Sequence, residues 1–590
     1  MAGGVRHHDC FDRRPLASTT PGTLPAMSQV VSHEQTFLAP GQAAIEALRI
    51  NGTTVVFGLN GDHVLKLYEG LADTPSIRHV IVKHENNAAL AAEAYGRLSE
   101  RPGVVVVTAG PGALNSISGI ASAYASGAPI VHLSGAVPTT AALETFHGVD
   151  EVDFTERMFA PVTKWSTRVT DAASIVPTIN RAFRLAVDGR PAPVHVEITR
   201  DLLESPARVV APSRPEPAPS ASPAGDLDAT LARMRAARNP LIIAGKGAWY
   251  PTASAALVRF AEALGAPVAW TWEGHGAMPT MHPLALGPFR LMGTHPAVDA
   301  AIARADLVLG VGLRPGIEAH RAVQEAVGER LTVLGAADVP NPHDGPVILS
   351  VPSLVATLDA LAKRISRTPS AAEAIEACAM AQRALARGIE VELVRHAATR
   401  PWHIGLALRE LDRRMTPDAI VTSDVSNIKL WVPLLVRAFG PASHLQSGSW
   451  GTMGYALPAA IGAALARPGQ KVVALAGDTS FLMSSNDLVT LAQLKLPIVM
   501  AVHKDGRIGM IDYMQRQAGR EPYAVEIGDV DLVKMAEAAG VRSIRVREPS
   551  EIAGAWADAL AAAEPVLIEF TAGFDFPRPS VPRFVTQGAV

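Results

Sequence analysis

The sequence is poor in the features that mark several classes of protein. Its 590 residues contain two cysteines, Cys10 and Cys378, too few for a disulfide framework or a cysteine-ligated metal cluster. A formal net charge of -3 gives no basic surface for nucleic acid or anionic lipid. No apolar run approaches the ~20 residues of a membrane-spanning helix. We therefore expect a cytoplasmic protein that binds neither nucleic acid nor membrane.

The first 33 residues lack hydrophobic periodicity as well. They mix histidines, arginines and prolines, and they contain no apolar segment that would serve as a signal peptide. Asp9 and Asp12 argue against a transit peptide, because such peptides avoid acidic residues. We predict a disordered extension, with Met27 as an alternative start.

The chain is rich in apolar residues, which make up 48% of it, against 18% charged residues. This balance is typical of a globular protein, and the length exceeds what one core supports. From Gln35 onward, short apolar runs alternate with helical segments, the pattern of parallel α/β sheets. The predicted organisation is an extension (1–33), a first domain (34–205), a Pro/Ala/Ser-rich linker (206–226), a central domain (227–366), a helical connector (367–401), a third domain (402–580) and a tail (581–590). Strands are expected near 54–58, 78–83, 104–108, 130–134 and 194–198 in the first domain, and near 241–244, 268–272, 307–311, 331–334 and 347–351 in the central one.

The clearest chemical signal is a βαβ unit between residues 471 and 509. Its first apolar run breaks into Gly477-Asp478-Thr479-Ser480, and its second into Lys504-Asp505-Gly506. Both acidic residues therefore follow parallel strands, at the sheet edge where open α/β sheets bind ligands. Ser484 and Asp487 have capping-box spacing, which predicts a helix that starts beside Asp478. Two carboxylates and a helix N-terminus suit a magnesium–diphosphate site, and two ordinary polar loops are the alternative.

A third carboxylate, Glu85, follows the strand at 78–83 and begins an alanine-rich helix. Taken locally, it is a glutamate that the helix dipole stabilises at the protein surface. The next strand ends in Thr-Ala-Gly-Pro-Gly-Ala-Leu-Asn115, a glycine turn that lets the backbone approach a ligand closely.

Together these motifs resemble thiamine-diphosphate-dependent enzymes of the acetolactate synthase type. The resemblance rests on the segment around Glu85, the glycine turn, Gly451-Thr-Met-Gly454, Gly477-Asp478 and the 27-residue spacing from Asp478 to Asp505. It covers about residues 35–575 and implies pyrimidine-binding, central and diphosphate-binding domains, each a helix-flanked parallel sheet. It also implies a homodimer or homotetramer, in which the third domain of one chain and the first domain of its partner share each cofactor.

The resemblance assigns roles to individual residues. Glu85 matches the glutamate that hydrogen-bonds the aminopyrimidine ring and so favours the tautomer that activates the thiazolium carbon. Met453 matches the apolar residue that wedges the cofactor into a bent shape. The metal ligands would be Asp478, Asp505 and the carbonyl of Arg507, and the other cofactor contacts would come from Ser426, Asn427, Gly477, Thr479 and Ser480.

Two histidines are further candidates for catalysis. His63 occupies a position that holds a working histidine in some lyases related to benzaldehyde lyase. His147 falls where many members carry a glutamine that faces the cofactor. Each is equally explained as a solvated or structurally bonded histidine, since histidine titrates near neutrality in any setting.

The sequence also departs from the family pattern. Thr479 replaces a glycine, at some cost in backbone freedom, and Lys504-Asp505 replaces an Asn-Asn pair, although Asp505 still offers oxygen to magnesium. The loop at 144–164 is longer than in ordinary acetolactate synthases and closer to oxalyl-CoA decarboxylase-like members. The central strand that leads to Asp338 lacks one of two acidic residues often found where nucleotide ribose binds, which argues against retained FAD.

The function expected from the resemblance is a thiamine-diphosphate- and Mg²⁺-dependent enzyme that acts on a 2-keto acid or acyloin. An acetolactate synthase-like condensation of pyruvate is the first hypothesis. A decarboxylase or C–C lyase of the same family is the second, favoured by His63 and the longer loop. A non-catalytic protein that binds thiamine diphosphate or a nucleotide is the third, and Glu85 argues against it.

Overall fold

The structure is a computed structural model of the chain. It describes residues 37–140, 146–213, 227–289, 296–314, 323, 325–336, 347–351, 353–397, 399–440 and 443–573. The predicted extension, most of the predicted linker, Asp338 and the predicted tail lie outside these ranges. None of the described helices is long and apolar enough to cross a membrane.

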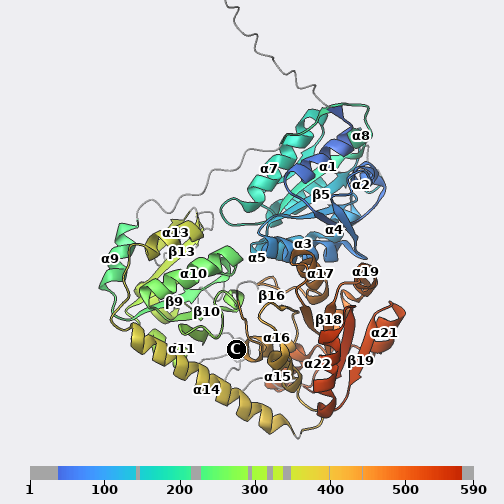
Figure 1. Cartoon of the computed structure of the whole chain (residues 1–590). Coiled ribbons are helices and arrows are strands. Elements are labelled where there is room, and N and C mark those ends of the chain that lie inside the picture. Colours follow the sequence, from blue (N-terminus) through green and yellow to red (C-terminus); the bar gives the residue numbers. More distant parts are fainter. Residues whose placement is uncertain are drawn as a thin grey trace, which may run out of the picture. The chain divides into compact units, whose positions relative to one another are not determined.

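Three six-stranded parallel sheets form the framework, as the sequence predicts (Figure 1). The first has the order β3-β2-β4-β5-β7-β6, the central β11-β10-β9-β12-β13-β14, and the third β16-β15-β17-β18-β20-β19. A two-stranded antiparallel pair, β1 (Phe37–Leu38) with β8 (Val209–Val210), is the other sheet among the described residues.

The first sheet contains β2 (Val55–Leu59), β3 (Arg78–Ile81), β4 (Gly103–Val107), β5 (Ile130–Ala136), β6 (Ser166–Val169) and β7 (Val194–Thr199). Its main helices are α1 (Pro40–Ile50), α2 (Leu65–Ala72), α3 (Glu85–Ser99), α5 (Ile117–Ser126) and α7 (Ile175–Val187). The four valines of β4 are completely buried, because a central parallel strand is covered on both faces.

The central sheet contains β9 (Pro240–Ala244), β10 (Val268–Trp270), β11 (Ala285–Pro288), β12 (Leu307–Val311), β13 (Leu331–Ala336) and β14 (Val347–Val351). Its helices include α9 (Asp228–Ala236), α10 (Pro251–Leu264), α11 (Pro296–Arg304) and α13 (Leu354–Ala362). The predicted connector is one long helix, α14 (Ala371–Ala397).

The third sheet contains β15 (Ile420–Ser423), β16 (His444–Gln446), β17 (Val472–Gly477), β18 (Ile498–Lys504), β19 (Arg542–Val546) and β20 (Val566–Thr571). Its helices are α15 (Gly405–Arg414), α16 (Ile428–Leu435), α17 (Ala456–Ala466), α18 (Asp478–Leu482), α19 (Leu488–Leu494), α20 (Gly509–Gln517), α21 (Leu532–Ala538) and α22 (Ile552–Ala561).

The first and third sheets share a core through α3 and α17, two helices rich in alanine. Their backbones lie so close that a Cβ atom on Gly462 would sit 2.0 Å from the carbonyl oxygen of Ala91. Hydrogen bonds extend this contact: Asp487 accepts the backbone N–H of Lys83 at 2.7 Å. The small side chains therefore permit a close helix–helix contact between the domains.

Candidate active site

Asp478 and Asp505 lie at the carboxyl edge of the third sheet, as predicted. Asp478 directly follows β17, and Asp505 directly follows β18. In the third sheet, β16 lies on one side of β15, and the next strand along the chain, β17, lies on the other side of β15. The strand order therefore reverses between β15 and β17. Ligands of open α/β sheets bind at such a point.

Asp478 is buried and accepts three backbone N–H groups. Its Oδ1 accepts the N–H of Thr479 at 2.7 Å, and its Oδ2 accepts those of Gly506 at 2.7 Å and Asp505 at 3.2 Å. Burial raises the pKa of Asp478, and the neighbouring Asp505 carboxylate raises it further. The site thus holds two like charges close together in a poorly hydrated place.

Asp505 and Thr479 connect this edge to its neighbours. Asp505 accepts the side-chain amide of Asn427 at 3.1 Å and the N–H of Arg507 at 3.2 Å. The Thr479 hydroxyl donates to the carbonyl of Arg507 at 3.1 Å. Gly509 permits the close approach of Asn427, since a Cβ there would lie 1.8 Å from its Nδ2 atom.

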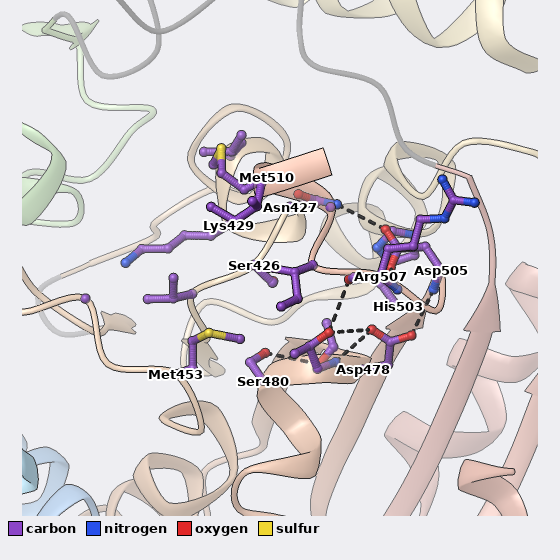
Figure 2. Close-up of a pocket in the computed structure, with 18 of the residues that line it drawn as sticks. Ser426, Asn427, Lys429, Met453, Asp478, Ser480, His503, Asp505, Arg507 and Met510 are labelled. Carbon is purple, nitrogen blue, oxygen red and sulfur yellow. Dashed lines mark hydrogen bonds between the residues drawn. The ribbon is translucent and has the colours of Figure 1, made fainter. Parts of the chain in front are cut away.

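A cavity of about 470 Å³ opens on this edge. All residues predicted to bind the metal, the diphosphate or, in the case of Met453, the cofactor rings line it: Ser426, Asn427, Met453, Gly477, Asp478, Thr479, Ser480, Asp505 and Arg507. Figure 2 shows Asp478, Asp505 and Arg507 toward one end of the labelled side chains, and Met453 and Lys429 toward the other. Polar oxygens therefore gather at one end, and the thioether of Met453 lies apart from them.

The donor set fits a hard cation with a diphosphate. Two carboxylates and one backbone carbonyl are oxygen ligands of the kind Mg²⁺ prefers, and a carbonyl oxygen keeps a second lone pair when one is bonded. Within the described ranges, no three His, Cys, Asp or Glu side chains gather as metal ligands, and the predicted set needs only two. Ser426 Oγ and Asn427 Oδ1 are buried polar atoms without a hydrogen-bond partner among the described residues. Ser426 is thus available to a phosphate oxygen.

Glu85 lies at a different sheet edge, after β3 and at the start of α3. It is 7% exposed, so the surface position that its local sequence suggests is wrong. Its Oε2 accepts the side-chain amide of Asn115 at 3.0 Å. A Cβ on Gly112, in the predicted glycine turn, would lie 3.4 Å from Glu85 Oε1. The turn therefore lies directly against this carboxylate.

The two candidate histidines lie together near that edge. The rings of His63 and His147 stack with centroids 4.9 Å apart, and Phe146 stacks on His147 at 4.0 Å. Burial lowers the pKa of His63, and His147 lowers it further, so both effects favour the neutral form of His63. Among the described residues, neither Nδ1 atom has a hydrogen-bond partner. His147 has a φ of 65°, a left-handed conformation uncommon for a residue with a Cβ.

One expectation about this region is wrong. Ser484 and Asp487 form no capping box: the Ser484 hydroxyl has no partner among the described residues, and Asp487 accepts hydrogen bonds from Lys83 and Thr490. The interaction of Asp487 with the first domain competes with local capping. Thr479 is the second residue of helix α18, an ordinary conformation for a residue with a Cβ, so its replacement of glycine causes no backbone strain.

The cavity residues that sequence reasoning missed include Trp272, Glu273 and Lys429. Trp272 and Glu273 follow β10, so the same carboxyl-edge rule that located Asp478 could have found them. Lys429 is the second residue of α16, which directly follows Ser426-Asn427, and its burial is not visible in the sequence.

Three family models match the chain in order. They are the N-terminal binding domain (residues 40–156), the central domain (227–326) and the C-terminal binding domain (424–570) of thiamine pyrophosphate enzymes. A probable acetolactate synthase large subunit from Methanocaldococcus jannaschii is 30% identical over 551 residues, 90% of this chain and 91% of that protein. The catabolic acetolactate synthase of Raoultella terrigena is 32% identical over 533 residues, covering 88% and 93%. The acetolactate synthase of Bacillus subtilis is 29% identical over 540 residues, covering 90% and 92%.

Proposed function

Because the chain belongs to the thiamine pyrophosphate enzyme family and is similar to acetolactate synthases along most of its length, we propose that it is a magnesium-dependent carboligase that condenses 2-keto acids. Pyruvate is the proposed substrate, and the cytoplasm is the proposed location. The observation that carries the proposal is the carboxylate pair of buried Asp478 and half-buried Asp505 at the carboxyl edge of the third sheet, in a cavity that Met453 also lines.

Three side chains and one backbone group would hold the cofactor's charged end. Asp478, Asp505 and the carbonyl of Arg507 would bind Mg²⁺, and Ser426 would donate to the diphosphate. The cation would neutralise the repulsion between the two carboxylates, which is why two neighbouring like charges suit this role.

When bound, thiamine diphosphate would supply a nucleophilic carbon for attack on a carbonyl and a thiazolium ring that takes up the electron pair of the adjacent carbon–carbon bond. Glu85 would hold a proton at the aminopyrimidine ring nitrogen. Because Glu85 is buried, water would not compete for this hydrogen bond. Neutral His63 and its neighbour His147 would exchange a proton with the substrate oxygen.

The complete site requires two copies of the chain. None of the described residues that line the Asp478 cavity belongs to the first sheet domain, which carries Glu85, His63 and His147. We therefore propose a homodimer or homotetramer in which the first domain of one copy faces the cavity of the other.

A decarboxylase or C–C lyase is the second candidate, and the stacked histidine pair favours it. Cleavage of an acyloin carbon–carbon bond requires removal of the proton of a hydroxyl group, and a neutral histidine can accept that proton. A non-catalytic binding protein would have little use for Glu85, which is buried and held by Asn115.

We further propose that the central domain carries no flavin. At the reversal point of the central sheet, the N–H of Gly247 donates to the carbonyl of Gly312 at 2.9 Å, so the loops after β9 and β12 touch directly. This contact leaves less room for a dinucleotide between them.

The test is turnover of purified protein with thiamine diphosphate and Mg²⁺, with products identified by mass spectrometry. The substrates are pyruvate, 2-ketobutyrate, benzoylformate, benzoin and oxalyl-CoA, and Glu85→Gln is the control. Acetolactate from pyruvate supports the carboligase, whereas benzaldehyde from benzoin or formyl-CoA from oxalyl-CoA supports the second candidate. If wild type and Glu85→Gln are equally inactive on all five, the proposal fails. An absorbance band of flavin in the purified protein would contradict the flavin-free central domain.

A further inference from the structure

The loop from Ser447 to Gly454 connects β16 to α17 and carries Met453 into the cavity. Gly451 and Gly454 have φ of 70° and 80°, so the loop contains two left-handed turns that glycine adopts without strain. A loop with this backbone freedom needs other contacts to fix the direction in which it presents Met453.

Two ionisable side chains of opposite charge hold the start of this loop. Glu273 Oε1 accepts the N–H of Ser449 at 2.8 Å, and Lys429 Nζ donates to the carbonyl of Ser447 at 2.7 Å. Gly448 lies between them, and a Cβ there would lie 2.9 Å from Glu273 Oε1 and 2.8 Å from Ser126 Oγ, so a side chain at this position would displace one of these groups. Hydrogen bonds to charged side chains therefore hold the backbone on both sides of Gly448, at the carbonyl of Ser447 and at the N–H of Ser449.

Each of these side chains is fixed by further contacts. Glu273 pairs with Lys246 at 2.6 Å, and Lys246 also donates to the carbonyl of Ala125 at the end of α5. Lys429 Nζ lies 4.6 Å from the ring centroid of Trp272. The side chains of Glu273 and Lys246 are 12% and 8% exposed, so neither ion is free to turn into solvent. A continuous path of polar contacts therefore runs from the first domain through the central domain to the cavity loop.

Buried charges are a costly means of simple attachment, because apolar side chains of similar volume usually join domains at least as well. Charged groups that bond particular peptide N–H and C=O groups specify one backbone geometry. Both Glu273 and Lys429 also line the cavity, next to the loop that they hold. Their placement suits control of the loop's position.

We propose that Glu273, from the central domain, and Lys429, from α16, form a charge clamp that positions the Ser447–Gly454 loop and so holds Met453 against the cofactor. The clamp rests on the proposed function, since the cofactor in question is thiamine diphosphate. Both are positioning residues, and they make the central domain part of the cofactor site.

The test measures thiamine diphosphate affinity by calorimetry in saturating Mg²⁺, together with the melting temperature of each protein without cofactor. Glu273→Ala removes both contacts of the carboxylate, Glu273→Gln keeps an acceptor for Ser449 and loses the ion pair, and Lys429→Met removes the bond to Ser447. Asp359→Asn is the matched control, because it breaks an ion pair with Arg259 (2.8 Å) in the central domain and does not line the cavity.

We expect Glu273→Ala and Lys429→Met to bind the cofactor about tenfold more weakly or worse, which corresponds to about 1.4 kcal/mol. Glu273→Gln should be intermediate, and Asp359→Asn should match wild type. If wild type binds and the clamp variants bind equally well, the clamp is wrong and the proposed function stands. If affinity falls only in step with the melting temperature, including in Glu273→Gln, the residues are merely structural and the clamp is also wrong. If wild type itself does not bind, both proposals fall.

Discussion

Asp478 and Asp505 should respond differently to replacement by asparagine. Asn at 505 keeps an oxygen that can face a cation, and its amide can still be oriented to accept either the N–H of Arg507 or the side chain of Asn427. Asn at 478 has one acceptor where three N–H groups now bond two oxygens. Either the N–H of Thr479 or the N–H groups of Asp505 and Gly506 must therefore face the amide NH₂ group of the asparagine.

The magnitude follows from these contacts. Hydrogen bonds to a charged acceptor contribute about 1.5–3 kcal/mol each, and an N–H that faces NH₂ loses its partner outright. Removing a supporting contact of a bound metal weakens its affinity about 10–100-fold, and Asp478→Asn alters both a ligand and the loop beside it. We expect Mg²⁺-dependent thiamine diphosphate binding to weaken at least about 100-fold in Asp478→Asn. In Asp505→Asn the change should stay within about tenfold, since relief of the like-charge repulsion offsets the lost bond.

The assay is calorimetric titration with thiamine diphosphate over a series of Mg²⁺ concentrations, with circular dichroism to show that each variant is folded. Wild-type affinity in Asp478→Asn would refute the assignment of that carboxylate as a metal ligand. An equal loss in both variants would refute the distinction drawn from their hydrogen bonds.

Three other perturbations test separate parts of the account. Glu85→Gln should lower kcat by about 10²–10⁴ and leave the melting temperature nearly unchanged, measured by steady-state kinetics and calorimetry; a fully active variant would exclude Glu85 from proton transfer. Burial lowers the pKa of His132 to about 3 and that of His195 well below its usual value. Below about pH 6.5 the unfolded chain therefore binds protons at these two histidines that the folded protein does not bind, so the free energy of unfolding should fall as the pH falls. Urea unfolding at about pH 7 and pH 5 checks this, and His195→Gln should flatten the dependence; an unchanged slope would contradict it. Gly462→Val should cost about 1–3 kcal/mol by overpacking α3 against α17, whereas Gly554→Ala in α22, whose Cβ would meet nothing within 4 Å, should be neutral or stabilising; equal urea midpoints would refute the packing argument.

Much of the framework could be predicted from the sequence because buried parallel strands are continuous apolar runs. The strands around Val104–Val107 and Leu307–Val311 were expected within one residue of their observed bounds. In the first and central six-stranded sheets, two strands were not expected: β6, with the half-buried sequence Ser-Thr-Arg-Val, and β11, which contains Gly and Pro. Both lie at sheet edges, where one neighbour is missing and no long apolar run is required.

The candidate site was predictable where residues adjacent in sequence create it. Gly477-Asp478 and Lys504-Asp505 end neighbouring strands, so topology alone brings their carboxylates together. The approach of Glu273 to Ser449 was not predictable, because it depends on how the central domain packs against the third. The role of Asp487 was misjudged for the same reason, since a contact with the first domain replaces the local cap.

The central claim is that each active site needs Glu85 from one chain and Asp478 from another. The most direct measurement mixes Glu85→Gln with Asp478→Asn under conditions that exchange subunits and follows pyruvate consumption. Thiamine diphosphate is kept at a concentration that saturates wild type and not Asp478→Asn, so that each variant alone has little activity. In a dimer with two symmetric sites, half of the dimers are mixed and each has one intact site, so activity should return to about a quarter of wild type. Failure to recover activity, when labelled subunits are seen to exchange, would contradict the shared site.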